Sequence, residues 1–195
     1  MIPRFLNLVS SAVILGWLSL PGSSCQAEST TVQSATQDAL QAGRALCKVI
    51  SPTDAGRTGS HQSGLYLPKQ AWRFFTTSAP VEEQNRREAV EITWTGGEKT
   101  DAVVSWYGKG SRSEFRLTRL GDRLGPDKVG DLLVLVPRGA GKFQAHLLPT
   151  DEEAVEFSTA LGIEPGQRWG FYEKPPAIET EPGIHAIGDL INTPA

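Results

Sequence analysis

The sequence predicts a mixed, mainly β fold. The chain has 20 glycines and 13 prolines, and its apolar runs are short and separated by these turn-forming residues. Short apolar runs separated by glycine and proline are typical of a turn-rich sheet and unlike the sequence of a helix bundle. With 195 residues, of which 39% are hydrophobic, the chain can bury one core, so we expect one domain with terminal extensions.

Residues 1–27 form an apolar leader, in which Arg4 precedes a hydrophobic run that ends before Pro21. This order is typical of a secretory signal peptide, here with cleavage after Ala27. An extension created by a misassigned start codon is the competing interpretation. A membrane anchor is disfavoured because the run is short. The domain organisation expected beyond the leader is a linker at 28–36, a domain at 37–170 and a tail containing proline and glycine at 171–195.

Hydrophobic periodicity predicts the elements of the domain. A short amphipathic helix is expected at 37–47, a buried helical turn at 70–75, and a helix from Thr150 to about Leu161, where Thr150 and Glu153 have the spacing of a capping box. We expect the continuously apolar strand at 132–136 in the interior of the sheet. The strands are predicted at 48–50, 65–67, 90–94, 102–106, 114–119, 132–136 and 143–148, with a turn at Gly96 and Gly97.

Charge is distributed unevenly. The formal net charge is -3, but residues 150–195 carry nine acidic and two basic side chains, a net charge of -7, which leaves +4 for residues 1–149. An anionic partner is therefore compatible with the composition, because a local patch sets the local field. The basic patch lies at 109–128 and contains Lys109, Arg112, Arg116, Arg119, Arg123 and Lys128, against Glu114, Asp122 and Asp127. It is interpreted either as a DNA-contacting arm or as a solvated charged hairpin.

Motifs of catalysis are missing from the sequence. No lysine follows a carboxylate at the two-residue spacing of many metal-dependent nucleases, and the chain has no HExxH, GxSxG, GxGxxG or phosphate-binding GK(S/T) motif. The histidines, His61, His146 and His185, are far apart, and Cys25 and Cys47 form no CxxC pair. We predict no catalytic centre, no metal site and no cofactor, and we expect His146, in an apolar strand, to be structural.

The stretch from 51 to 69 combines small and turn-forming residues with long polar side chains, including Arg57, His61 and Gln62. Glycine-rich backbone presents such side chains outward, so the stretch is either a recognition loop or an ordinary polar turn before a strand. It also resembles the amino-terminal effector-DNA-binding domain of the restriction endonuclease EcoRII, with the pattern S-x-x-D-x-G-x-T-G-x-H-Q-x-G-x-Y-x-P. The matching residues are Ser51, Asp54, Gly56, Thr58, Gly59, His61, Gln62, Gly64, Tyr66 and Pro68.

Two further matches follow in order. Residues 107–121 resemble that family's second DNA-contacting arm, and residues 150–166 resemble its acidic helix and following turn, so the resemblance covers about residues 38–166. It implies an open, seven-stranded DNA-binding pseudobarrel with short flanking helices. Three departures are visible: Arg57 replaces a small residue, Phe115 replaces a basic one, and the second arm has one extra residue.

Carried over by position, the resemblance implies that two arms grip the major groove of double-stranded DNA at a CC(A/T)GG-like site. Lys48, Lys109 and Arg119 are expected at phosphates. His61, Arg112, Glu114 and Arg116 are expected at base edges. The complete set of predicted DNA-binding residues is Lys48, Arg57, His61, Gln62, Tyr66, Lys109, Arg112, Glu114, Arg116 and Arg119.

The family's separate nuclease domain has no counterpart here, so the sequence predicts a DNA-binding protein without catalytic activity. A stand-alone protein, a truncated gene and a subunit that works with a separately encoded nuclease are the open explanations. We expect it in the cytoplasm, without stable membrane association if the leader is absent or cleaved. The alternative, favoured by residues 1–27, is an exported envelope protein with a β-rich ligand-binding or enzymatic role.

Overall fold

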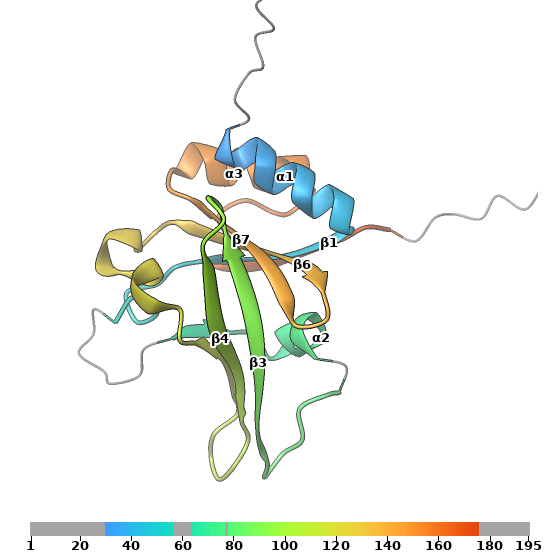
Figure 1. Cartoon of the computed structure of the whole chain (residues 1–195), viewed down its shortest axis with the longest axis vertical. Helices are drawn as coiled ribbons and strands as arrows, with labels where there is room; N and C mark the ends of the chain where they lie inside the picture. Colours follow the sequence, from blue (N-terminus) through green and yellow to red (C-terminus); the bar gives the residue numbers. More distant parts are fainter. Residues whose placement is uncertain (1–29, 57–63, 77, 176–195) are drawn as a thin grey trace, which may run out of the picture.

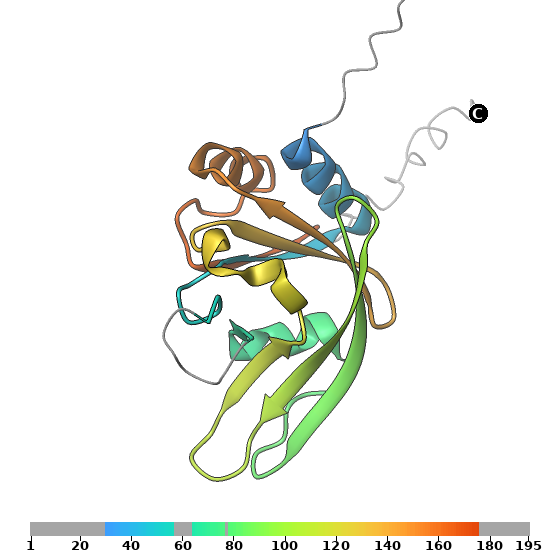
Figure 2. The same ribbon diagram turned by 60° about the vertical axis from the view of Figure 1, so that its left-hand side comes forward.

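The computed structural model describes residues 30–56, 64–76 and 78–175. Its strands form one sheet in the order β2-β5-β4-β3-β7-β6-β1-β8. Neighbours are antiparallel except β3 and β7, which are parallel, and the sheet curls into an open half-barrel (Figures 1 and 2). The strands are β1 Arg44–Val49, β2 Leu65–Leu67, β3 Asn85–Trp94, β4 Lys99–Tyr107, β5 Glu114–Thr118, β6 Leu132–Gly139, β7 Lys142–Leu148 and β8 Trp169–Glu173.

Short helices flank the sheet. The α-helices are α1 Thr31–Ala42, α2 Trp72–Phe75 and α3 Asp151–Ala160, and the 3₁₀ turns are η1 Lys69–Ala71, η2 Gly121–Leu124 and η3 Pro126–Lys128. Helices α1 and α3 lie together at one end of the molecule (Figure 1). Among the described residues, no helix is long and apolar enough to cross a membrane.

Apolar side chains form two cores, one on each side of the sheet. Inside the curl, Phe75 of α2 packs against Phe115 and Phe143, with ring centroids 6.4 and 5.0 Å away. On the other side, Ala39 of α1 and Phe157 of α3 are completely buried with the apolar residues of β1, β6 and β7. The sheet is thus covered on one face by α1 and α3 and bent around α2 on the other.

The mixed, mainly β prediction is confirmed, but the described part of the chain forms a sheet of eight strands where the resemblance implied seven. Strand β8 was not predicted, because its exposed and half-buried residues lack alternation. The buried helical turn and the hairpin of β3 and β4 are confirmed. So is the interior position of β6, which lies between β7 and β1.

The boundary between helix α1 and strand β1 differs from the prediction. The helix begins at Thr31, inside the stretch predicted as a linker, because Thr30 and Gln33 form a capping box ahead of the predicted start. It ends at Ala42 and is followed by Gly43, whose positive φ of 71° places it in the left-handed region. Strand β1 therefore begins at Arg44, within the stretch predicted to be helical.

Candidate nucleic-acid interface

Two loops, called the first and second arm, connect the strands that lie beside β5, and residues 57–63 of the first arm lie outside the described residues. The first arm, residues 50–64, joins β1 to β2, and the second arm, residues 108–113, joins β4 to β5. Because β2 and β5 are antiparallel, with Leu65 opposite Leu117, the arms meet β5 at its opposite ends. Five strand residues place these ends roughly 14 Å apart, which is comparable to the width of the major groove, about 12 Å.

The base of the first arm is held together by the buried carboxylate of Asp54. Its Oδ2 accepts hydrogen bonds from Lys48 Nζ at 2.6 Å and from the backbone N and Oγ of Ser51 at 2.9 and 2.6 Å. Its Oδ1 accepts from the backbone N of Tyr66 at 2.8 Å. Asp54 therefore ties the end of β1 and the start of the arm to strand β2.

The ion pair between Lys48 and Asp54 is almost closed to solvent, with side-chain exposures of 9% and 1%. Burial alone would raise the pKa of Asp54, but the hydrogen bonds from Lys48, Ser51 and Tyr66 outweigh it and lower the pKa below its usual value. The Lys48 ammonium also donates to the carbonyl of Val49. Lys48 is thus engaged at the base of the arm.

The second arm is anchored to the first residue of β3 and to the segment just before it. Asn85 Oδ1 accepts from the backbone N of Gly108 at 3.1 Å and of Lys109 at 3.3 Å, and the Gly108 carbonyl accepts from Glu83 N at 2.7 Å. A Cβ on Gly108 would lie 2.6 Å from the carbonyl oxygen of Gln84. Only glycine fits at this close approach of two backbone segments.

A charged cluster lies where the second arm enters strand β5. The Glu114 carboxylate receives Arg112 Nε on Oε1 at 3.1 Å and Arg116 Nε and Nη2 on Oε2 at 2.8 and 2.7 Å. Partial burial opposes ionisation, yet the hydrogen bonds and charges of both arginines keep the pKa of Glu114 below its usual range. The carboxylate is therefore ionised at neutral pH and orients two guanidinium groups.

The two arginines of the cluster differ in accessibility. The Arg116 side chain is only 12% exposed, whereas that of Arg112 is 43% exposed. The guanidinium of Arg112 also lies over the ring of Tyr107, 4.5 Å from its centroid, a contact that favours one orientation. Among the described residues, Arg112 binds a carboxylate through Nε, so its two terminal nitrogens form a fork that can donate to an external acceptor.

Strand pairing places Tyr66 beside this cluster. Tyr66 of β2 lies directly opposite Arg116 of β5, so the two side chains share the outer face, and Tyr66 is 47% exposed. Phe115 points to the other face, where it is buried against Trp106. Arg119 follows β5 with a positive φ of 63°. The face between the arms thus combines an exposed aromatic ring with several cations.

The structure brings five of the predicted DNA-binding residues together on this face or on the second arm: Tyr66, Lys109, Arg112, Glu114 and Arg116. Arg119 lies at the far end of β5, and Lys48 lies in the buried ion pair. Arg57, His61 and Gln62 lie outside the described residues. Sequence reasoning missed Asn85 and Tyr107, although the alternation of β3 and β4, followed to its ends, places both beside Glu114.

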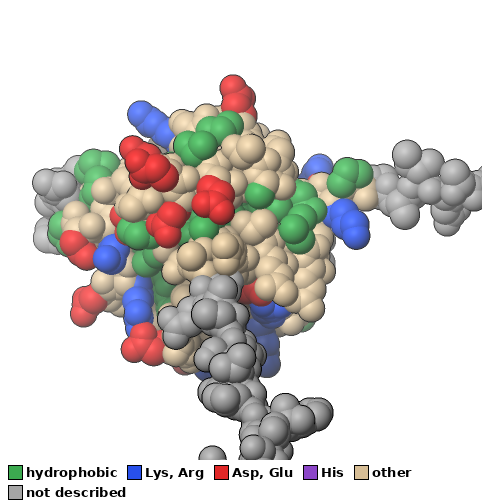
Figure 3. All heavy atoms as spheres, turned by 90° about the horizontal axis from the view of Figure 1, so that it is seen from above, with side chains coloured by type: hydrophobic (Ala, Val, Ile, Leu, Met, Phe, Trp, Pro, Cys, Tyr) green, Lys and Arg blue, Asp and Glu red, His purple; other side chains and the backbone are tan. Residues whose placement is uncertain are grey.

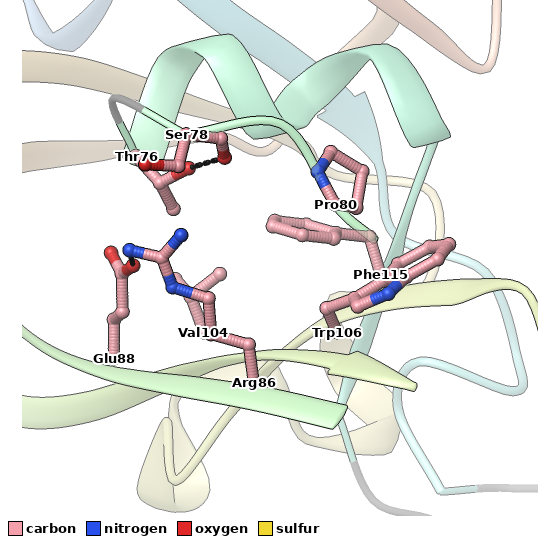
Figure 4. A pocket seen from close by; sticks show the side chains of 8 residues that line it. All are labelled: Thr76, Ser78, Pro80, Arg86, Glu88, Val104, Trp106 and Phe115. Carbon is pink, nitrogen blue, oxygen red and sulfur yellow. Dashed lines mark hydrogen bonds and ion pairs between the residues drawn. The ribbon is translucent and has the colours of Figure 1, made fainter. Parts of the chain in front are cut away.

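Other polar groups serve the fold. His146 is buried, with Nε2 2.9 Å from Asp38 Oδ2 and Nδ1 3.0 Å from Thr95 Oγ1. Arg86 pairs with Glu88 beside Trp106 in a cavity of about 10 Å³ (Figure 4), which is at the lower limit for one water molecule. Within the described ranges, no group of three or more potential metal ligands is present.

Comparison with known families matches the region that contains the charged cluster. The family described as "Restriction endonuclease EcoRII, N-terminal" matches residues 39–169, about two thirds of the chain. The matched region runs from within α1 to the start of β8 and contains both arms and the cluster at Glu114. No curated protein matches the sequence.

Proposed function

Because this chain belongs to the family of EcoRII N-terminal domains, we propose that it binds double-stranded DNA sequence-specifically, at a short CC(A/T)GG-like site, and has no nuclease centre of its own. The observation that carries the proposal is the cluster of Arg112, Glu114 and Arg116 on the face between the two arms. These are the residue types that read base pairs, and they are oriented before any ligand arrives.

Arg112 is the main reader of this proposal. Its terminal nitrogens form a fork of the kind that donates to O6 and N7 of guanine, while Glu114 and Tyr107 favour one orientation of the guanidinium. Glu114 accepts a hydrogen bond from the amino group of cytosine, as carboxylates do in the major groove. Arg116, largely covered and bound to one oxygen of Glu114, positions that carboxylate and reads a base when DNA displaces part of the pair.

Phosphate contacts come from cations that pair with no carboxylate of the described residues. Among the described residues, Lys109 and Arg119 have no carboxylate partner, and they lie at the two ends of β5. The Lys48 ammonium forms an ion pair with Asp54 at the base of the first arm. Lys48 therefore supports DNA binding by holding the base of this arm in place, without contacting a phosphate itself. Arg57, His61, Gln62 and Tyr66 complete the proposed DNA-binding set from the first arm and its following strand.

Selection of bound duplexes from a random pool, at a fixed salt concentration, tests the proposal. We expect enrichment of a short, nearly palindromic site rich in G·C pairs. Arg112→Ala should lower affinity for that site by about 1–3 kcal/mol and relax the preference at one base pair. Lys109→Ala is the matched control, and should weaken all sequences alike. A pool without any enriched motif would contradict sequence-specific binding.

The proposed partners and compartment follow from the same function. A DNA-reading domain without a nuclease centre acts alone or directs a separately encoded nuclease, and we place it in the cytoplasm, where its ligand is. Mass spectrometry of the native amino terminus, with cell fractionation, tests the location. Cleavage after Ala27 together with a periplasmic location would favour the exported alternative.

A further inference from the structure

Arg87 of strand β3 lies on the same outer face as the cluster, although it is 29 positions from Arg116 in the sequence. Strand pairing puts Arg87 opposite Ser105 of β4, and Ser105 opposite Arg116 of β5. Since directly opposed residues of a sheet point to the same side, the row continues from Tyr66 through Arg116 and Ser105 to Arg87. Arg87 therefore shares the face that lies between the arms.

The neighbouring arginine shows the contrast. Arg86 points to the inner face, where it pairs with Glu88 beside Val104 and Trp106 (Figure 4). Arg87 is exposed and lines an open hollow of about 380 Å³ together with Tyr107, Thr118 and Arg119. The hollow thus has an arginine from β3 and another from the end of β5.

Within the described ranges, Arg87 has no carboxylate partner, although carboxylates are near. Glu88 is held by Arg86. Glu91, four residues after Arg87 on the same face of β3, is held by Lys99 at 3.1 Å. An exposed arginine left unpaired beside two neutralised carboxylates retains its full charge. The face therefore attracts an anion on the β3 side of the cluster.

We propose that Arg87 contacts a backbone phosphate of the bound duplex, on the β3 side of the groove read by Arg112 and Glu114. This inference rests on the proposed function. Adjacent strands are about 4.8 Å apart, so Arg87 and Arg116 are separated by about 10 Å, whereas the major groove is about 12 Å wide. When the base edges in the major groove contact the cluster, the backbone phosphates at one edge of that groove lie over Arg87.

The charge count of the face supports this assignment. Arg112 and Arg116 share the Glu114 carboxylate, so the three side chains together supply one net positive charge. Most of the attraction to phosphates must then come from the unpaired cations Lys109, Arg119 and Arg87. Arg87 extends the phosphate-binding surface from the arms to strand β3.

The test is the salt dependence of binding for Arg87→Ala, Arg87→Lys and the wild-type chain, each on the selected site and on a scrambled duplex. Arg73→Ala is the matched control, because Arg73 is an exposed arginine of α2, on the inner side of the curl. Arg87→Ala should weaken both duplexes by the same factor and reduce the slope of log K against log salt by about 1. Arg87→Lys should keep that slope, and Arg73→Ala should leave it unchanged.

Two failures are distinguishable. If the wild type prefers its selected site but Arg87→Ala has the same slope as Arg73→Ala, the role of Arg87 is wrong and the proposed function stands. If the wild type prefers no duplex at any salt concentration, the proposed function fails and the role of Arg87 fails with it. Equal melting temperatures of the variants and the wild type ensure that folding does not account for either result.

Discussion

At the scale of single residues, Asp54 links the stability of the domain to the shape of its first arm. Its carboxylate is buried and bonded to Lys48, Ser51 and Tyr66. Asp54→Asn would leave the Lys48 ammonium buried without its counter-charge, which typically costs about 3–5 kcal/mol. We expect the free energy of unfolding, measured with urea, to fall by an amount of this order.

A second substitution separates the lost charge from the lost geometry. The double variant Asp54→Asn/Lys48→Met no longer has the uncompensated ammonium, so part of the stability should return. The amide at position 54 still accepts weaker hydrogen bonds from Ser51 and Tyr66 than the carboxylate does. DNA affinity should therefore stay low in the double variant. Full recovery of affinity together with stability would show that Asp54 has no part in shaping the arm.

Sequence patterns identified several of these residues but not what they do. Ser51 and Asp54 stood in the pattern that supported the resemblance, yet their mutual hydrogen bonds depend on the backbone turning back on itself. The sequence predicts Lys48 at a phosphate. The structure instead pairs it with Asp54, six residues away across a turn, and this pairing cannot be recognised from the order of the residues. A charge count along the chain does not reveal which charges neutralise each other in space.

At the scale of elements, the second arm depends on a close approach that involves no DNA-contacting side chain. In Gly108→Ala the new Cβ would meet carbonyl oxygens of Val81 and Gln84 at 2.9 and 2.6 Å, and Trp106 Nε1 at 2.5 Å. The backbone atoms can move apart only by distorting the arm and the neighbouring segment, so we expect a destabilisation of about 1–3 kcal/mol, measured by thermal melting. DNA binding, measured by titration, should also be weaker. Ser111→Ala, on the same arm, should leave the melting temperature unchanged. A wild-type melting temperature for Gly108→Ala would contradict the proposed anchor.

Element boundaries followed local signals where these were strong. Thr150 caps α3 as expected, accepting from Glu153 N at 3.1 Å. Strand β3 begins at Asn85, several residues before the predicted start at Val90. The first residues of the strand are charged and mostly exposed, so they lack the alternation of apolar and polar residues that predicts a strand. The same charged stretch contains Arg87, so the weak signal that shortened the predicted strand also concealed a residue of the proposed interface.

At the scale of the whole molecule, the buried His146 couples the α1 and α3 side of the sheet to pH. Burial lowers the pKa of His146 below its usual value, although Asp38 opposes the shift and Arg138, which pairs with Asp38, adds to it. The unfolded chain therefore binds a proton more readily than the folded one. The stabilisation by neutral His146 is complete above about pH 6.5 and is lost as the pH falls below it.

Urea unfolding between pH 5 and 8 measures this dependence. The free energy of unfolding should decrease as the pH falls below about 6.5. In His146→Gln this part of the dependence should disappear, because the titrating group is removed. Asp54 and Glu114, with pKa values lowered below those of ordinary carboxyls, titrate at lower pH and leave this window undisturbed. An equal slope in His146→Gln would assign the dependence to another group.

The division of charge between the two ends of the molecule has a kinetic consequence. Acidic side chains gather over the helical end (Figure 3), where the first turn of α3 contributes Asp151, Glu152 and Glu153, while the second arm lies at the opposite end (Figure 1). A polyanion repels the first end and attracts the second, so the molecule turns before contact. Fewer encounters with DNA then occur in a wrong orientation, so the acidic helical end raises the rate of productive association under the proposed function.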